Sequence, residues 1–262
     1  MFTRLLASTA YLPRLTGFAP GFTTGIASQC AVCRSWPAQQ VCQACVARFA
    51  RAERRCIRCA LALPADLSMG LRTGPPLCGA CAVDPPPLDR AFAAVAYAYP
   101  WSTLIAGYKF GERHGWAGFF AGLLLQSPGL AEALDELGPE DWLLPVPLSA
   151  ERLQARGFNQ AWELCAALAR QTRTAARADA QLLLRTRHTR PQSQLKRQER
   201  LANVKGAFQV DPLRVAELRG RRVVLVDDVM TSGASLYTAA QALREAGAEH
   251  ITAVVLARTA AT

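Results

Sequence analysis

Eight of the nine cysteines form four C-x-x-C pairs, and this regularity limits how the chain can fold more than any other feature. The pairs are Cys30/Cys33, Cys42/Cys45, Cys56/Cys59 and Cys78/Cys81. A C-x-x-C turn directs two sulfurs to one point, and two such turns complete a tetrahedral site of four sulfurs. Zinc is the metal that we expect, at two structural sites, although the spacing alone leaves iron–sulfur ligation open.

The order of the pairs leaves two ways of joining them. Sequential ribbons join the first pair to the second and the third to the fourth, whereas a cross-brace joins the first to the third. We favour sequential ribbons because each loop then closes locally at a lower entropic cost. A disulfide framework needs an oxidising compartment, and residues 1–29 make a poor signal peptide. Cys165 stands alone in an apolar helical pattern and is predicted to be a buried thiol.

The chain is predicted to have three parts. Residues 1–28 form an N-terminal extension, residues 29–84 a double zinc ribbon, and residues 85–262 a larger domain. The boundary lies at the three prolines 85–87, because consecutive prolines force an extended backbone and end regular structure. No apolar run approaches the roughly 20 residues that a membrane-spanning helix needs, so we expect no integral membrane segment.

Apolar patterns after these prolines predict strands that alternate with helices. We expect strands at residues 91–99, 142–146, 182–184, 223–226 and 251–256. We expect helices at residues 101–110, 116–126, 130–137, 159–172, 193–203 and 235–246, with Asn159 as an N-cap and Gly247 just after the last helix. The β-branched run 223–226 is typical of a central parallel strand. The alternation predicts an α/β fold with a central parallel sheet flanked by helices.

The most specific motif follows the predicted strand 223–226. Asp227 and Asp228 come directly after this strand, and a Thr-Ser-Gly-Ala-Ser loop at residues 231–235 opens the next helix. Ligands bind at the carboxyl ends of parallel strands, and the N–H groups at a helix N-terminus attract phosphate. Carboxylates hold sugar hydroxyls directly or through Mg²⁺. We therefore expect a phosphosugar site; the alternative is a Rossmann-like turn whose acidic pair caps a helix, at the cost of repulsion between adjacent carboxylates.

This stretch closely resembles the phosphoribosyl pyrophosphate (PRPP) binding motif of type I phosphoribosyltransferases. The resemblance implies that Asp227 and Asp228 contact the ribose hydroxyls and that Mg²⁺ accompanies PRPP. It also implies that the 5′-phosphate is wrapped by Thr231, Ser232, Gly233, Ala234 and Ser235.

More of the chain is similar to the ComF family, also called ComF/GntX. The similar stretches are residues 108–111, 144–148, 156–160, 191–192 and 203–208, together with Arg152 and Arg200. The cysteine pairs followed by a type I phosphoribosyltransferase-like core complete the family's architecture over residues 29–259. The resemblance implies a cytoplasmic protein of natural competence that serves the uptake of transforming single-stranded DNA. It also implies a partner helicase at the inner face of the membrane.

Two segments are expected to bind pyrophosphate because of their position in type I phosphoribosyltransferases. The first follows the strand 142–146 and includes Pro145, Val146 and Pro147, with Arg156 nearby. The second is the basic segment, whose candidates are Arg187, Arg190, Lys196, Arg197 and Arg200. The formal charge of +10 is concentrated there and in residues 1–90, since residues 185–205 hold seven basic residues and one acidic residue. A solvated basic loop is the alternative.

Two functions are consistent with these features. An enzyme would transfer the phosphoribosyl group from PRPP to an acceptor that the sequence does not identify, with release of pyrophosphate. No catalytic base is predicted, because His114, His188 and His250 have no motif context. A binding protein would instead sense PRPP or a nucleotide and hold single-stranded DNA or a protein partner through the ribbons. Its DNA contacts would come from Arg51, Arg54, Arg55 and Arg58, with Trp36 and Phe49 as weak stacking candidates.

Overall fold

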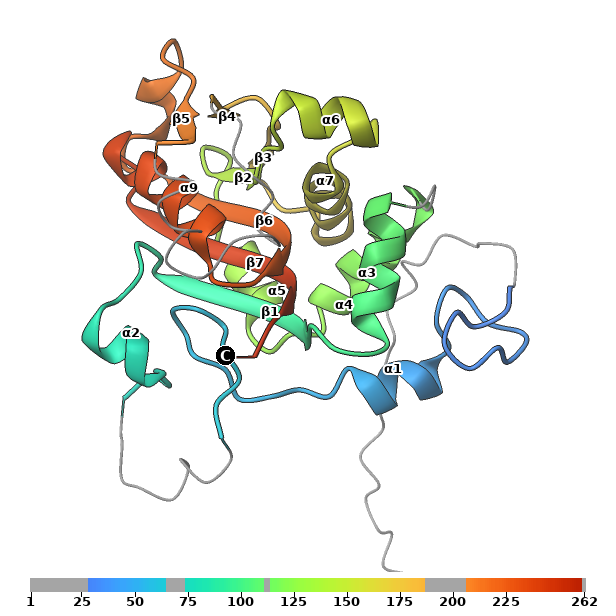
Figure 1. The fold of residues 1–262 in the computed structure, drawn as a ribbon. Helices are drawn as coiled ribbons and strands as arrows, with labels where there is room; N and C mark the ends of the chain where they lie inside the picture. The colour runs from blue at the N-terminus through green and yellow to red at the C-terminus, as the bar shows by residue number, and fades with distance from the viewer. Residues whose placement is uncertain (1–27, 65–73, 111–113, 187–205, 261–262) are drawn as a thin grey trace, which may run out of the picture.

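A five-stranded parallel sheet with the order β1-β7-β6-β2-β3 organises the larger part of the structure (Figure 1). This computed structural model describes residues 28–64, 74–110, 114–186 and 206–260. The strands are β1 (Arg90–Ala96), β2 (Trp142–Pro145), β3 (Arg177–Ala178), β6 (Arg222–Met230) and β7 (His250–Arg258). The parallel α/β fold predicted from the sequence is confirmed.

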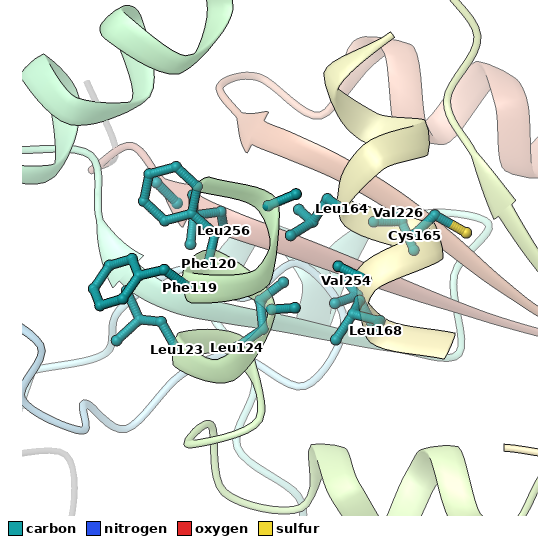
Figure 2. Close-up of a cluster of buried hydrophobic side chains, with 14 of the residues drawn as sticks. Phe119, Phe120, Leu123, Leu124, Leu164, Cys165, Leu168, Val226, Val254 and Leu256 are labelled. Carbon is teal, nitrogen blue, oxygen red and sulfur yellow. The ribbon is translucent and has the colours of Figure 1, made fainter. Parts of the chain in front are cut away.

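Helices cover both faces of the sheet, so the central strands carry apolar residues on both faces over most of their length. One face packs against α3 (Trp101–Phe110), α4 (Ala117–Leu124), α5 (Leu130–Asp135) and α7 (Gln160–Thr172). On the other face lie α9 (Ala234–Glu245) and a separate antiparallel pair of strands, β4 (Leu183–Arg185) and β5 (Phe208–Val210). Figure 2 shows Phe120 and Leu124 of α4 and Leu164 of α7 packed over the strand residues Val226 and Val254.

Several details of the prediction are confirmed. The α7 helix begins after Asn159, whose Oδ1 accepts a hydrogen bond from the Ala161 backbone N–H at 3.0 Å. Cys165 lies on this helix, and its side chain is fully buried in the core. Gly247 follows the C-cap of α9 with φ of +96°, a conformation that glycine adopts without strain.

Other details of the prediction are wrong or lie outside the described residues. The central strand continues to Met230 instead of ending at Val226, because β7 pairs with it as far as Arg258. The helix α6 (Ala150–Arg156) was not expected; Ser149 caps its N-terminus and Gly157, with φ of +82°, ends it. The predicted helix 193–203 falls outside the described residues.

The two halves of the cysteine-rich part repeat one local structure. In each half a C-x-x-C turn places the next residue, Arg34 or Ala60, in the left-handed region, with its N–H bonded to the carbonyl of the first cysteine. A helix then begins in each half: α1 (Gln43–Phe49) is preceded by Cys42, and α2 (Gly79–Val83) by Cys78. The sequence accounts for this repetition: in each half the first C-x-x-C pair forms a turn, and the second pair lies at the start of a helix.

The two halves differ in what they pack against. Trp101 of α3 donates a hydrogen bond from Nε1 to the Phe49 carbonyl at 2.7 Å, which ties α1 to the helices on one face of the sheet. The second half adjoins β1 and α9: Ala91 donates its N–H to the Ile57 carbonyl at 2.7 Å, and Tyr237 of α9 packs against the cysteines. No helix in the described part of the chain is long and apolar enough to span a membrane.

Candidate functional site

The carboxyl ends of β1, β2 and β6 surround a cavity of about 500 Å³. Tyr97 lines it just after β1, Val146 lines it just after β2, and Asp227 and Asp228 line it from the second half of β6. Because neighbouring parallel strands end at the same edge of a sheet, residues far apart in the chain meet here. The volume falls within the range of small-molecule sites.

The two carboxylates are held in different ways. Asp228 is only 3% exposed, and its Oδ2 lies 2.9 Å from Nζ of Lys109, which reaches the cavity from α3. Asp227 accepts a hydrogen bond through Oδ1 from the Asp228 backbone N–H at 2.8 Å. Burial and the neighbouring Asp228 carboxylate together raise the pKa of Asp227 to about 8, although Lys109 opposes this rise. The site therefore favours a ligand that offers hydroxyl donors or a cation to Asp227.

The loop at residues 231–235 joins β6 to α9, and its shape requires a glycine. Gly233 is the N-cap of α9 with φ of +83°, and a Cβ at this position would overlap the ring of Tyr237. Ser232 accepts a hydrogen bond through Oγ from the Ala234 N–H at 3.4 Å. The N-terminus of this 12-residue helix thus faces the cavity with the partial positive charge that phosphate groups prefer.

Four cations line the same cavity as the two carboxylates. Lys109 comes from α3, Arg152 and Arg156 lie one turn apart on α6, and Arg185 ends β4. Arg156 donates a hydrogen bond to Oε1 of Gln160, and its guanidinium lies 5.0 Å from the ring centre of Phe110. Burial, together with the nearby charge of Arg152, lowers the pKa of Arg185 to about 10. A polyanionic ligand would relieve this crowding of positive charge.

The structure brings together most of the residues that the sequence singled out. The cavity is lined by Asp227, Asp228, Thr231, Gly233, Ala234, Ser235, Val146, Pro147 and Arg156. Ser232 lies within the loop, and Pro145 is buried as the last residue of β2, so neither is among the lining residues. Arg187, Arg190, Lys196, Arg197 and Arg200 lie outside the described residues.

The predicted site residues did not include Lys109 or Arg152, and Arg185 began the expected basic segment 185–200 without being named among its candidates. Lys109 carried a usable signal, because it is one of only three lysines in a chain whose other basic residues are all arginines. Arg152 and Arg185 carried a weaker signal, since they reach the cavity through the unexpected helix α6 and the short strand β4.

The cysteines form two groups in the sequential arrangement. Cys30, Cys33, Cys42 and Cys45 make the first cluster, and Cys56, Cys59, Cys78 and Cys81 make the second, with all four sulfurs of each cluster within 4.8 Å of one another. The Sγ atoms of Cys33 and Cys42 are 3.6 Å apart and those of Cys59 and Cys78 are 3.7 Å apart. A tetrahedral zinc site requires about 3.8 Å between sulfurs, whereas a disulfide requires about 2.05 Å.

The surroundings of the sulfurs also fit zinc. Cys30 accepts hydrogen bonds through Sγ from the backbone N–H groups of Val32 and Cys42, at 3.4 and 3.3 Å. The second cluster is wholly buried, whereas Cys33 in the first is exposed. A hydrogen bond from Cys59 lowers the pKa of Cys56 to about 4, but burial raises the pKa of Cys81 to about 12, so a central cation is needed for all four thiolates to form together. All eight residues therefore suit two zinc ions, which would supply folding energy.

The fold, the acidic pair and the loop at residues 231–235 define a phosphoribosyltransferase-type domain, here joined to two four-cysteine clusters. Residues 168–262 match the family model of the phosphoribosyl transferase domain. The chain is 35% identical to DNA utilization protein YhgH of Salmonella typhi over 210 residues, which are 78% of this chain and 90% of that protein. It is 33% identical to Competence protein F of Haemophilus influenzae over 181 residues, or 69% and 78% of the two chains.

Competence protein ComFC of Bacillus subtilis is 35% identical over 105 residues, which are 40% of this chain and 39% of that protein. The chain belongs to the ComF family, whose members these competence proteins are.

Metal content tests the two clusters. We expect about two zinc ions per chain by elemental analysis, because each cluster provides a complete set of four sulfur ligands. Cys78→Ser should lower the content to about one ion, and Cys165→Ser, which changes a core thiol outside both clusters, should leave it at two. An unchanged content in Cys78→Ser would contradict a metal at the second cluster.

The raised pKa of Asp227 predicts a pH-dependent stability. Between the ordinary carboxyl pKa of about 3.9 and the folded value of about 8, the folded protein binds one more proton than the unfolded chain. Its stability therefore falls as the pH rises through this window. Asp227→Asn removes this dependence, so its melting temperature should exceed that of the wild type by much more at pH 8 than at pH 4.5. Asp135→Asn, at an exposed position, is the control; an equal difference at both pH values would show that Asp227 is not perturbed.

Proposed function

We propose that the chain binds PRPP with Mg²⁺ in the cavity at the ends of β1, β2 and β6. One observation carries this proposal. The Asp227–Asp228 pair, the loop that follows and the N-terminus of α9 lie within nine consecutive residues and line one cavity. A vicinal diol fits the carboxylates, and a phosphate fits the loop. Few ligands other than phosphoribosyl compounds combine these groups at this spacing.

The remaining cations suit the pyrophosphate part of PRPP. Arg152, Arg156 and Arg185 line the same cavity as the carboxylates, and so do residues 146–148. Mg²⁺ prefers carboxylate and phosphate oxygens and would neutralise part of the pyrophosphate charge. In a transfer reaction the arginines would stabilise the charge that develops on departing pyrophosphate, while the loop keeps the 5′-phosphate in place. The basic segment with Arg187, Arg190, Lys196, Arg197 and Arg200 is proposed to add to this charge.

We further propose that this phosphoribosyl site serves the use of DNA in competence, as the names of the relatives indicate for those proteins. Two features of the cysteine-rich part support contact with single-stranded DNA. Trp36 is 64% exposed, and Arg51 and Arg54 are exposed in the segment between the two clusters. Exposed aromatic rings and arginines bind the bases and phosphates of single strands without sequence preference. A helicase partner and a cytoplasmic location remain predictions.

The other DNA candidates of the ribbons are already engaged within the protein. Arg55 pairs with Glu53 at 2.6 Å and donates to the Ala60 carbonyl, whereas Arg58 lies 3.6 Å from Asp89. Phe49 packs edge-on against Tyr99, with ring centres 5.9 Å apart. We therefore assign the proposed DNA contact to Trp36, Arg51 and Arg54.

Calorimetry tests the phosphoribosyl site. The double variant Asp227→Asn/Asp228→Asn should lose measurable PRPP binding in the presence of Mg²⁺, because amides neither accept as strongly from the ribose hydroxyls nor attract the cation. The matched control is Glu132→Gln/Asp135→Asn, which removes the same charge from exposed positions of α5 and should bind as the wild type does. Wild-type affinity in the first variant would refute the site.

The salt dependence of DNA binding tests the proposed contact. Arg51→Gln/Arg54→Gln should weaken binding to a single-stranded oligonucleotide and flatten the plot of log K against log salt by roughly 0.7 per lost phosphate contact. Arg170→Gln/Arg173→Gln, which removes the same charge at the exposed end of α7, should leave the slope unchanged. Equal slopes for both variants would place the DNA elsewhere.

A further inference from the structure

A buried arginine connects the second cysteine cluster with the loop at residues 231–235, called here the phosphate loop because of the function proposed above. Arg258, the last residue of β7, is 8% exposed, and its Nε donates a hydrogen bond to the Cys59 carbonyl at 3.0 Å. Its Nη1 donates to the Met230 carbonyl at 3.1 Å and also to the carbonyl of Thr231. Met230 ends β6 and Thr231 begins the loop, so the planar guanidinium spans from a cluster cysteine to the loop's first residue.

A second contact reaches the middle of the same loop. Tyr237 lies on the first turn of α9 and packs against the four cysteines of the second cluster. Its ring is so close to Gly233 that a Cβ there would overlap it. A shift of the cysteines would therefore displace the Tyr237 ring, which packs directly against Gly233. Through Arg258 and Tyr237 the cluster touches both the start and the N-cap end of the loop.

Charge makes the connection depend on the metal. The hydrogen-bond partners found for Arg258 in the described part of the chain are carbonyl and hydroxyl oxygens, not carboxylates. A buried guanidinium needs compensating negative charge. Four thiolates around a divalent ion carry a net charge of −2, so the metal-loaded second cluster would supply this charge next to the Cys59 carbonyl that Arg258 binds. Loss of the metal would leave the thiolates without a cation and Arg258 without nearby negative charge.

The first cluster provides a built-in comparison. It has the same four sulfur ligands and the same local structure, but its helix α1 is tied to Trp101 of α3, on the other face of the sheet from α9. In the described residues, none of the hydrogen bonds found for the first cluster reaches residues 231–235. The two clusters thus offer similar metal sites with unequal relations to the cavity.

We propose that metal binding at the second cluster positions the phosphate loop through Arg258 and Tyr237, so that this metal and the phosphorylated ligand bind cooperatively. The identity of the ligand as PRPP rests on the function proposed above. Cooperativity in binding is reciprocal: if the metal tightens the site for PRPP, PRPP retains the metal by the same factor. Arg258 and Tyr237 are positioning residues for the loop and do not contact the ligand.

Metal release by the full-length, zinc-loaded protein tests the proposal. The coloured chelator 4-(2-pyridylazo)resorcinol is added with and without PRPP and Mg²⁺, and Cys33→Ser identifies the release phase of the first cluster by removing it. We expect PRPP to slow release from the second cluster about tenfold and to leave the first phase unchanged. Equal slowing of both phases, or of neither, in a protein that binds PRPP by calorimetry would overturn the proposal.

Variants of the connecting residues separate positioning from a general loss of structure. Arg258→Gln and Tyr237→Leu should keep two zinc ions, lose the PRPP-dependent slowing and bind PRPP about tenfold more weakly. Slowing that persists in both variants would contradict the route through these side chains. If either variant fails to fold, as judged by circular dichroism, the other decides.

Hydrogen exchange distinguishes failure of this proposal from failure of the proposed function. Absence of PRPP binding by the wild type would refute the PRPP assignment. Amide exchange in the loop, measured without ligand, would then still test whether the second cluster positions it. Cys78→Ser should increase amide exchange at residues 231–235, whereas Cys33→Ser should not. The same exchange in both variants would refute positioning by the second cluster.

Discussion

The parallel pairing of β6 with β2 on one side and β7 on the other is the constraint on which the cavity depends. This pairing places the end of β2 beside Asp227 and carries β7 to Arg258, opposite Met230. The carboxylates, the turn after β2 and the buried arginine thus meet at one edge of the sheet. Because strand β6 is apolar on both faces, its register is set by packing against α7 and α9, and a shift by one residue would turn Asp228 away from Lys109.

Short sequence patterns predicted those elements whose position depends on neighbouring residues in the chain. The apolar run 223–226, the N-cap Asn159 and the loop at residues 231–235 each specify an element within a few residues, and the structure has those elements. The extent of β6 could not be predicted in this way, because Asp227 and Val229 stay in the strand through pairing with β7, which is remote in sequence. The polar pair at residues 227–228 suggested that the strand ends there, but hydrogen bonds to β7 continue the strand through these residues.

The candidate site shows the same division between local and remote information. The acidic pair and the loop form one continuous motif, so they were recognised directly. The cations come from α3, α6 and β4, and only the folded sheet brings Lys109, Arg152 and Arg185 to the cavity. For the cysteines, spacing was sufficient to predict the sequential clusters, but it could not show that the second cluster lies against α9 and Arg258 while the first lies beneath α3.

The unequal burial of the two clusters determines how an oxidant would meet them. Cys33 is exposed, whereas every sulfur-bearing residue of the second cluster is buried. Peroxide and other thiol oxidants attack accessible thiolates first, so damage would begin at the cluster that holds α1 against the helices. The second cluster, which lies against α9, would be spared longest, so a metal at the first cluster would be lost before the loop at residues 231–235 was disturbed.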